Sequence, residues 1–438
     1  MGLPDDCRGA EIPVVWAEAV SRGTGGIGVM TGEPQDETAG PPPGARFQRR
    51  RADIIAAAIP ILNGQGFDGM HLTAVAERIG LRATGVTYYF PRKEELAVAC
   101  LEAGFDTVHG MLDAAEVEPD AASRIGRLIS LHIARDADVR RGQAAPIASF
   151  AAIRALEGGP LARVAEGYAR LFRRVRGLLE APELARLDAA DRTIRAIVLI
   201  EQLAWSSSWL DGYDLDLFPR LAARMTDITT NGMVRAGDVP GLHVIELGTG
   251  ATDMSKEGFL IAATRQINAH GYRGASVDRI SASLNRTKGA FYHHNEAKDD
   301  LVAACFRRSF SVASEAQRQA RALPGMERDR LMSAVAGLVR FQLGGEGPLL
   351  RASVLSSMPP AYRVEIMSQS DRVSRQFAAM IADAIADGSI RPVDPAIAGA
   401  LLHAAVNVAS DVRGLDIAAD PDIVNRIVRA MVCALPSA

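Results

Sequence analysis

The sequence predicts an all-α fold made of two tandem helical units, and three observations support this. Alanine, leucine and arginine are abundant while aromatic residues make up only 5%, a balance that favours helices. When the sequence is slid along itself by 205 residues, hydrophobic positions stay in phase over about fifty residues, which indicates an internal duplication. Neither copy contains the apolar–polar alternation that is typical of strands.

Length, charge and cysteine content narrow the class of protein. A chain of 438 residues exceeds one ordinary core, so two or three domains are expected. The net charge is only −3, so any nucleic-acid site must be local. The four cysteines form no CxxC pair, which favours reduced thiols over zinc or redox sites. No apolar run approaches the ~20 residues of a membrane span and the acidic N-terminus does not resemble a signal peptide, so we expect a cytoplasmic protein without membrane contact.

Residues 1–45 are expected to form a disordered acidic tail. They contain "GTGGIG" and "GPPPG", and seven acidic residues stand against two arginines. The stretch "IPVVWAEAV" offers an alternative, because it could dock as a helix. From Arg49 the pattern becomes helical, with Ile54, Ala58 and Leu62 on one face, and the glycine-rich stretch 63–66 is expected to end this first helix.

Two short helices and the start of a longer one are predicted next. The second helix covers 73–80, where Gly80 makes a tight turn, and the third covers 84–90. Pro91 is expected in the first turn of the fourth helix. This order of short helices around a glycine turn is typical of a helix-turn-helix unit.

The second copy repeats this arrangement and both copies continue as amphipathic helices. Cys100 falls on Cys305 and Lys93 on Lys298, and Asp394 is predicted to cap a helix that has Pro395 in its first turn. The expected domains are a tail (1–45), a first helix-turn-helix module (46–111), a first helical domain (112–236), a linker (237–252), a second module (253–316) and a second helical domain (317–438). The linker could span about 50 Å at ~3.3 Å per residue, enough for the halves to pair.

Here the chain resembles the tetracycline-repressor (TetR) family of bacterial transcription factors, twice. The segments that carry the resemblance are "FDGMHLTAVAERIGLRATGVTYYFPRKEELAVAC" and "YRGASVDRISASLNRTKGAFYHHNEAKDDLVAAC". The resemblance implies DNA-binding modules, each followed by a helical domain that holds a small-molecule pocket and pairs through its last helices. One chain with two copies would be a pseudo-dimer on double-stranded operator DNA. Pairing of two chains into a homodimer is the alternative.

A recognition helix places side chains against base edges in the major groove while its rear face packs inward. Val86 and Phe90 are expected in the core. The predicted DNA-binding residues of the first unit are Thr73, Arg82, Thr84, Thr87, Tyr88, Tyr89 and Lys93. Those of the second unit are Ser276, Thr287, Lys288, Tyr292, His293 and Lys298.

The two modules differ, which leaves an alternative in which only one binds DNA and the other unit senses or dimerises. Asn285 replaces the expected turn glycine, and Asn295 stands where the first unit has Phe90. The local net charge is +3 over 46–100 and +1 over 252–305, so the second module is electrostatically weaker. Arg49, with its two arginine neighbours, is either a phosphate contact or a solvated helix start.

Several side chains could serve a bound molecule, with packing as the competing interpretation. The candidate ligand-binding residues are Phe150, Tyr168, Trp205, Trp209, Phe377 and His403, for which core or interface packing is favoured. Cys100 and Cys305 are expected to be buried hydrophobes, with redox sensing as the alternative. His293 and its neighbour point about 100° apart on a helix and cannot chelate a metal together.

We therefore expect a ligand-responsive transcriptional regulator, with a repressor favoured. No cofactor is expected, although an unknown small-molecule inducer would be its effector. By changing the separation of the modules, the inducer would remove their match to successive major grooves about 34–36 Å apart. The sequence offers no nucleophile–base arrangement, metal spacing or phosphate loop, so an enzyme is not expected.

Overall fold

Helices account for nearly all regular structure in the computed structural model, which describes residues 44–234, 241–248, 254–275, 280, 298–344 and 347–436. The β-type pairing within these ranges consists of isolated bridges from Gly232 and Val234 to Cys433. The predicted all-α fold is thereby confirmed. The expected tail, residues 1–45, lies almost wholly outside the described residues.

The first unit begins with a three-helix head and continues as a larger helical body. The first head consists of α2 (Ala45–Gly69), α3 (Leu72–Arg78) and α4 (Ala83–Thr87). The first body consists of α5 (Lys93–Glu116), α6 (Ala121–Arg140), η1 (Phe150–Ala155), α7 (Gly158–Gly177), η2 (Pro182–Leu184), α8 (Ala189–Leu210), η3 (Leu215–Leu217) and α9 (Phe218–Asn231).

The second unit follows the same order. Its head, residues 254–297, is described through α10 (Met254–Gly274), Ala275 and Ile280. The second body consists of α13 (Lys298–Arg321), α14 (Glu327–Gly344), η4 (Ala352–Ser357), α15 (Pro360–Ala386), α16 (Pro395–Ala405), α17 (Val408–Val412), η5 (Asp416–Ala419) and α18 (Ile423–Val432).

The kink in the first helix of each unit shows the duplication at the level of the backbone. Gly66 in α2 has φ 69° and ψ 177°, and Gly271 in α10 has φ 74° and ψ 175°. Only glycine adopts this combination without strain. The expected end of the first helix at 63–66 was wrong in extent, because the helix continues through Asn63 and Gly64 and breaks at Gly66 alone.

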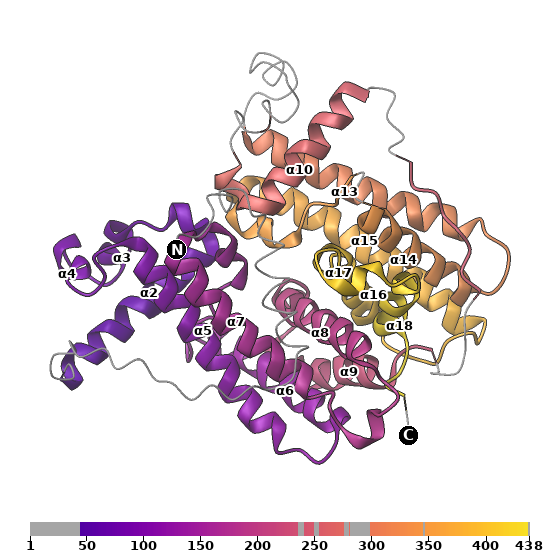
Figure 1. The fold of residues 1–438 in the computed structure, drawn as a ribbon, viewed down its shortest axis with the longest axis horizontal. Coiled ribbons are helices and arrows are strands. Elements are labelled where there is room, and N and C mark those ends of the chain that lie inside the picture. Colours follow the sequence, from indigo (N-terminus) through magenta and orange to yellow (C-terminus); the bar gives the residue numbers. More distant parts are fainter. Residues whose placement is uncertain are drawn as a thin grey trace, which may run out of the picture.

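The bodies pack together through their last helices. α8 contacts α16, α17 and α18, and α9 contacts α16 and α18. Figure 1 shows these helices side by side at the centre of the molecule. The C-terminal segment reinforces this contact, since the Met233 amide donates to the Val432 carbonyl (2.7 Å) and the Ala434 amide donates to the Val234 carbonyl (3.2 Å). The two units therefore share one continuous buried core.

Residues 241–248 of the linker lie against the second body. Ile245 is buried against Gly337 of α14, and the His243 amide donates to Ser333 Oγ (2.9 Å). This part of the connector is consequently packed onto one unit, and the full reach of a free 16-residue chain does not apply.

The stretch Pro395–Val412 is long and apolar enough, by composition, to cross a membrane. Within the protein, however, 72% of it is buried. Asp394 caps α16 as predicted, because its carboxylate accepts from the Ala396 and Ile397 amides. Gly399 allows α16 to lie directly on the backbone of α15. Packing in the core accounts for the apolar character of this stretch.

Candidate nucleic-acid interface

Helix α4 is held at a fixed angle to α3 by the turn at Gly80. Gly80 has φ +65°, a conformation that side chains other than glycine rarely adopt. The Leu81 amide donates back to the Ala76 carbonyl (2.8 Å) and closes the turn. The predicted helix-turn-helix arrangement of the first unit is present in this geometry.

The faces of α4 divide as the sequence predicts. Val86 is fully buried and Phe90 is 3% exposed, so both anchor the helix in the core of the head. Tyr88 is 73% exposed, and the half-buried Tyr89 packs against the core. The other candidates on or beside α4 and α3 are exposed, namely Thr73, Arg82, Thr84 and Thr87.

Two predicted helix limits were wrong. α4 ends at Thr87, and the expected helix to Phe90 is replaced by a turn in which the Tyr89 and Phe90 amides both donate to the Val86 carbonyl. Pro91 does not open the fourth helix, because α5 begins at Lys93 with Arg92 as its N-cap. The tighter turn brings Phe90 inward, beneath α4.

An aromatic cluster joins the start of α2 to the recognition helix. Phe47 contacts Tyr88 (ring centroids 6.1 Å) and Tyr89 (4.6 Å). The sequence analysis missed Phe47, although its place within the basic "RFQRRR" stretch was a signal. Phe47 packs on the two tyrosines that directly follow α4, so the start of α2, with the exposed Arg46 and Arg49, lies close to the recognition helix. Their positive charge is well placed to attract phosphate.

Lys93 is partly engaged within the head. Its Nζ lies 3.8 Å from the Asp68 carboxylate and 4.3 Å from the centre of the Phe67 ring. Lys298 has the equivalent position in the second unit, with Nζ 5.1 Å from the centre of the Tyr272 ring. Both lysines are thus held at the first turn of a long helix, where the helix dipole favours a phosphate.

The remaining DNA-binding candidates of the second unit lie outside the described residues. They are Ser276, Thr287, Lys288, Tyr292 and His293.

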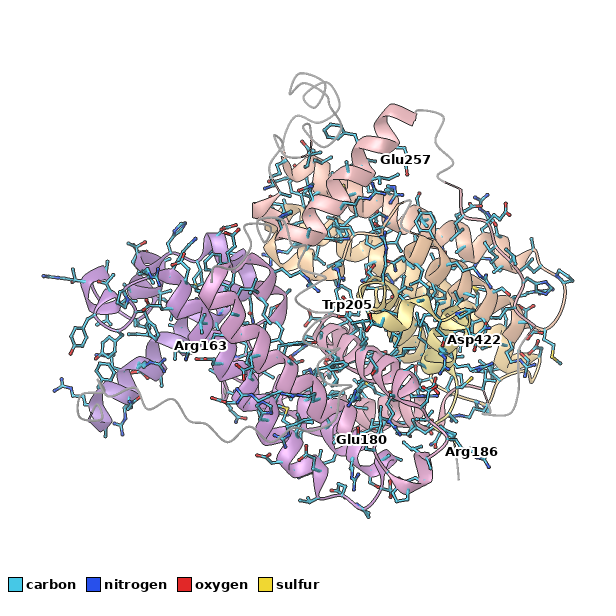
Figure 2. All side chains as sticks on the ribbon, viewed as in Figure 1. Arg163, Glu180, Arg186, Trp205, Glu257 and Asp422 are labelled. Atoms are coloured by element: carbon cyan, nitrogen blue, oxygen red, sulfur yellow. The ribbon has the colours of Figure 1, made fainter. Side chains whose placement is uncertain are left out.

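The structure separates the ligand-binding candidates. Phe150 and Tyr168 pack on one another in the first body (6.0 Å), and Phe377 is fully buried. Trp209 packs edge-on against Tyr213 (6.3 Å). Trp205 and His403 instead line a cavity in the second body. Figure 2 shows Trp205 where the two units meet.

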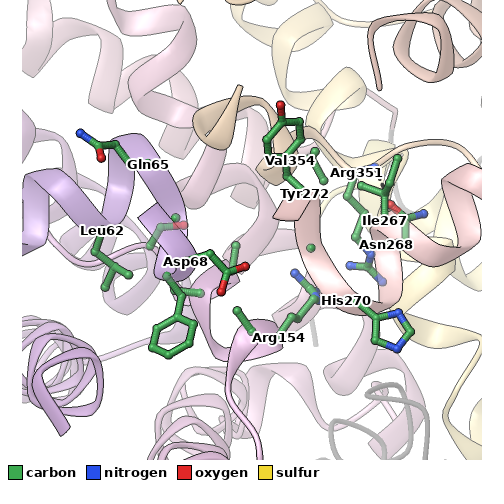
Figure 3. A pocket seen from close by; sticks show the side chains of 17 residues that line it. Leu62, Gln65, Asp68, Arg154, Ile267, Asn268, His270, Tyr272, Arg351 and Val354 are labelled. Atoms are coloured by element: carbon green, nitrogen blue, oxygen red, sulfur yellow. Dashed lines mark hydrogen bonds between the residues drawn. The ribbon is translucent and has the colours of Figure 1, made fainter. Parts of the chain in front are cut away.

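A second cavity, of about 60 Å³, lies between the heads. The ends of α2 and α10 and the helices η1 and η4 meet around it, as Figure 3 shows. Arg154 and Arg351 contribute to its wall from the two units. Both arginines also approach the carboxylate of Asp411, at 3.8 Å and 2.5 Å. Polar contacts between the two bodies therefore lie directly beside this cavity.

Cys100 and Cys305 are buried at equivalent positions. Each thiol donates to a carbonyl in the first helix of its unit, that of Ile55 at 3.9 Å and that of Leu260 at 3.6 Å. Burial raises the pKa of both thiols to about 12, which suppresses the thiolate that redox chemistry requires. The expected role as buried hydrophobes is confirmed.

Comparison with known proteins agrees with this geometry. A sequence model described as bacterial regulatory proteins of the tetR family matches residues 54–100 and again residues 259–305. The Transposon Tn10 TetC protein of Escherichia coli is 49% identical over 37 residues, which are 8% of this chain and 19% of that protein. The HTH-type transcriptional repressor AcnR of Corynebacterium diphtheriae is 32% identical over 62 residues, 14% of this chain and 33% of AcnR.

These alignments span a third or less of the length of both relatives. The crystal structure of AibR in complex with isovaleryl coenzyme A and operator DNA is similar at 18% identity, with a TM-score of 0.35, over 41% of this chain and 97% of AibR. The two family matches, at 54–100 and 259–305, each run from the first helix of a head into the first helix of the body that follows. The chain therefore carries two N-terminal modules of the tetR family of bacterial regulatory proteins in tandem.

Proposed function

We propose that this chain is a cytoplasmic, ligand-responsive transcriptional regulator, and a repressor, that uses its two heads as a pseudo-dimer on operator DNA. The observation that carries the proposal is the surface of α4. It presents Arg82, Thr84, Thr87 and Tyr88 to solvent while Val86 and Phe90 hold the helix from behind. These side chains suit base edges and phosphates in a major groove.

The packing of the bodies supports the use of both heads together. The contact of α8 and α9 with α16 and α18 joins two equivalent halves in one chain. Two recognition helices held in this way would reach successive major grooves, which lie about 34–36 Å apart. A molecule that shifts one body against the other would alter this spacing and release the DNA.

The contact between the heads supports this mode of control. Around the cavity of Figure 3, α2 touches η4 and α10 touches η1, so each head rests on the body of the other unit. A displacement of either body would therefore move the opposite head. Pairing of two chains, giving four heads, is an alternative that a molecular-mass measurement on the DNA complex distinguishes.

The proposal is tested on DNA fragments selected from the genome by the purified protein. Arg82→Ala with Tyr88→Ala should abolish selection, whereas Arg186→Ala should not. Arg186 is exposed on the body, far from α4 in Figure 2, and matches the charge removed. If the variant without Arg82 and Tyr88 selected the same DNA fragments as the native protein, the proposed role of α4 would be contradicted.

A second candidate function uses one head only, which the lower charge of the second head favours. Lys93→Ala and Lys298→Ala, made separately, distinguish the two. Loss of affinity in both variants supports two reading heads. A Lys298→Ala variant that binds like the native protein, with a footprint of one half-site, supports the single-head alternative.

A further inference from the structure

The interiors of the two bodies correspond residue by residue. α5 and α13 begin at Lys93 and Lys298, while η1 and η4 begin at Phe150 and Ala352. The same three positions inside each body are occupied by Phe105, Phe150 and Tyr168 in the first and by Phe310, Ala352 and Ser370 in the second. Two large rings of the first body are thus a methyl group and a hydroxymethyl group in the second.

The first body is filled by its own aromatic side chains. The centroid of the Phe105 ring lies 4.9 Å from that of Phe150 and 6.4 Å from that of Tyr168. Glycines make room for them, because a Cβ at Gly167 would lie 2.9 Å from the Phe105 ring and one at Gly104 would lie 3.1 Å from Phe150. A close-packed ring cluster of this kind leaves no space for a guest.

Charged groups close the first body beside these rings. Asp411 reaches in from the second unit and pairs with Arg351 (2.5 Å) and Arg154 (3.8 Å), and the three side chains are only 12–13% exposed. Glu201 of α8 faces the same group, where burial and the Asp411 charge raise the pKa of its carboxyl to about 7. Ionic groups from both units of the chain thus close the interior of the first body.

The second body has a cavity of about 40 Å³ in the corresponding place. Its wall is formed by Phe310, Ile366 and Val373, with Ala352 and Ser370 at the positions where the first body has rings. Among the described residues that line it, none is Asp, Glu, Lys or Arg. An apolar space without ionic groups is suited to an uncharged guest, because a charge buried there would have no partner.

Trp205 of the first unit closes this cavity. α8 and α16 are capped by Asp188 and Asp394, so Trp205 has the position that Asp411 has in the second unit. Each unit therefore completes the interior of the other, one with an indole and one with a carboxylate. The Trp205 ring stacks on His403, with centroids 6.4 Å apart and planes at 17°.

We propose that the chain has one effector site, the cavity of the second body, and that the corresponding place in the first body is permanently filled by the chain's own side chains. The effector is a small, uncharged, mainly apolar molecule with one hydroxyl or carbonyl group. This inference rests on the ligand response that is part of the proposed function.

Polar side chains in the cavity wall are available to hydrogen-bond this hydroxyl or carbonyl group. Burial lowers the pKa of His403 to about 4, so its imidazole is neutral near pH 7 and needs no anionic partner. Ser370 and Asn407 also line the space and offer a hydroxyl and an amide. A guest larger than the present cavity displaces Trp205, and since Trp205 belongs to α8, binding in the second unit moves a helix of the first.

Xenon, which enters dry apolar cavities, tests the inference in crystals of the full chain under xenon pressure. In the native protein, xenon should lie between Trp205 and Phe310, with none among the rings of the first body. Ala352→Phe with Ser370→Tyr copies the filled body into the second unit and should remove the xenon. Xenon in the first body, its absence from the native second body, or its persistence in the filled variant would overturn the inference.

A solution measurement covers the case in which the filled variant does not crystallise. In a chain with Trp16→Phe and Trp209→Phe, dissolved xenon should quench Trp205 emission saturably, through contact with the heavy atom. The filled variant should show only the linear quenching of random collisions, and equal quenching curves for the two proteins contradict the site. DNA selection is measured on the same proteins, so a failure to bind DNA would remove the proposed function while leaving the xenon result intact.

Discussion

Asn63 and Asn268 make the same two hydrogen bonds in the two units. The Asn63 amide donates to the Ile147 carbonyl (2.8 Å) and its oxygen accepts from the Ser149 amide (2.7 Å). Asn268 donates to the Leu349 carbonyl (2.9 Å) and accepts from the Arg351 amide (3.0 Å). Each asparagine ties the first helix of a head to the segment that enters η1 or η4. This polar tie is a direct link between each head and its own body.

Replacing either asparagine should loosen the head. Asn63→Ala leaves a backbone carbonyl and amide without their partner, at a cost of about 1–3 kcal/mol in the free energy of unfolding. Urea denaturation measures this cost. Asn268→Ala should cost a similar amount because its contacts are the same, and a difference greater than about 2 kcal/mol would contradict their equivalence.

The pH dependence of stability should depend on Glu201. Burial raises its pKa to about 7 from an unfolded value of 4.5, so between these values the folded chain binds more protons than the unfolded chain. Stability contributed by this group is full below pH 4.5 and is lost as the pH rises through 7. This loss is on the order of 2–3 kcal/mol in the free energy of unfolding, and Glu201→Gln should remove it. The variant should therefore be more stable than the native chain at pH 8.

The exposed Glu166 provides the control for this measurement. Glu166→Gln should follow the native curve of unfolding free energy from pH 5 to pH 8. His403 has a lowered pKa and contributes with the opposite sign, losing stability as the pH falls from 6.5 to about 4. This contribution is common to all three proteins and cancels in their differences. A Glu201→Gln curve parallel to the native one would show that the carboxyl is already ionised at low pH.

The two units hold an ion pair at equivalent positions with the charges interchanged, so reversing the charges of one pair should be tolerated. Arg163 binds Glu102 through two hydrogen bonds (2.6 and 2.8 Å), and at the matching place in the second body Arg307 binds Glu365 (3.0 and 3.3 Å). Because both pairs are largely exposed, Arg163→Glu alone should cost about 1 kcal/mol or less. Adding Glu102→Arg should restore the native melting temperature, and a double variant less stable than the single one would contradict this.

Salt dependence should separate the roles of residues in the first head. Lys93 is placed for a phosphate, so Lys93→Ala should weaken binding to all DNA sequences and reduce the slope of log affinity against log salt by about 1. Thr87→Ala should instead relax the preference at one or two base pairs, with little change in the slope. Titrations at several salt concentrations, with specific and unrelated DNA, measure both effects. A Thr87→Ala variant with an altered slope but unchanged preference would reverse the assignment.

Local chemistry made much of the fold predictable. Gly80, Val86 and Asp394 each follow a rule that depends on near neighbours, namely a left-handed turn, a buried helix face and an N-cap. The rule that glycine ends a helix failed at Gly64, because contacts of α2 with α5 and η1 hold the helix through it. Tertiary packing outweighs a propensity of about 1 kcal/mol.

The candidate sites were harder to predict because their partners are distant in sequence. Phe47 was missed because nothing local indicates that it meets Tyr88. Trp205 and Phe150 were both candidate ligand-binding residues, but the structure places Phe150 in a filled interior and Trp205 in the wall of the other unit's cavity. That separation depends on how the units dock, which the periodicity of a single helix does not encode.

The hydrogen bonds between residues 432–435 and the end of the first unit hold together two halves of a single polypeptide. Because both halves belong to one polypeptide, they meet at an effective concentration set by the linker, so their association does not weaken when copies are few. Exchange of halves with other polypeptides is suppressed for the same reason. Each half is also free to accumulate its own mutations, since no identical subunit must change with it, and a target site without two-fold symmetry becomes attainable.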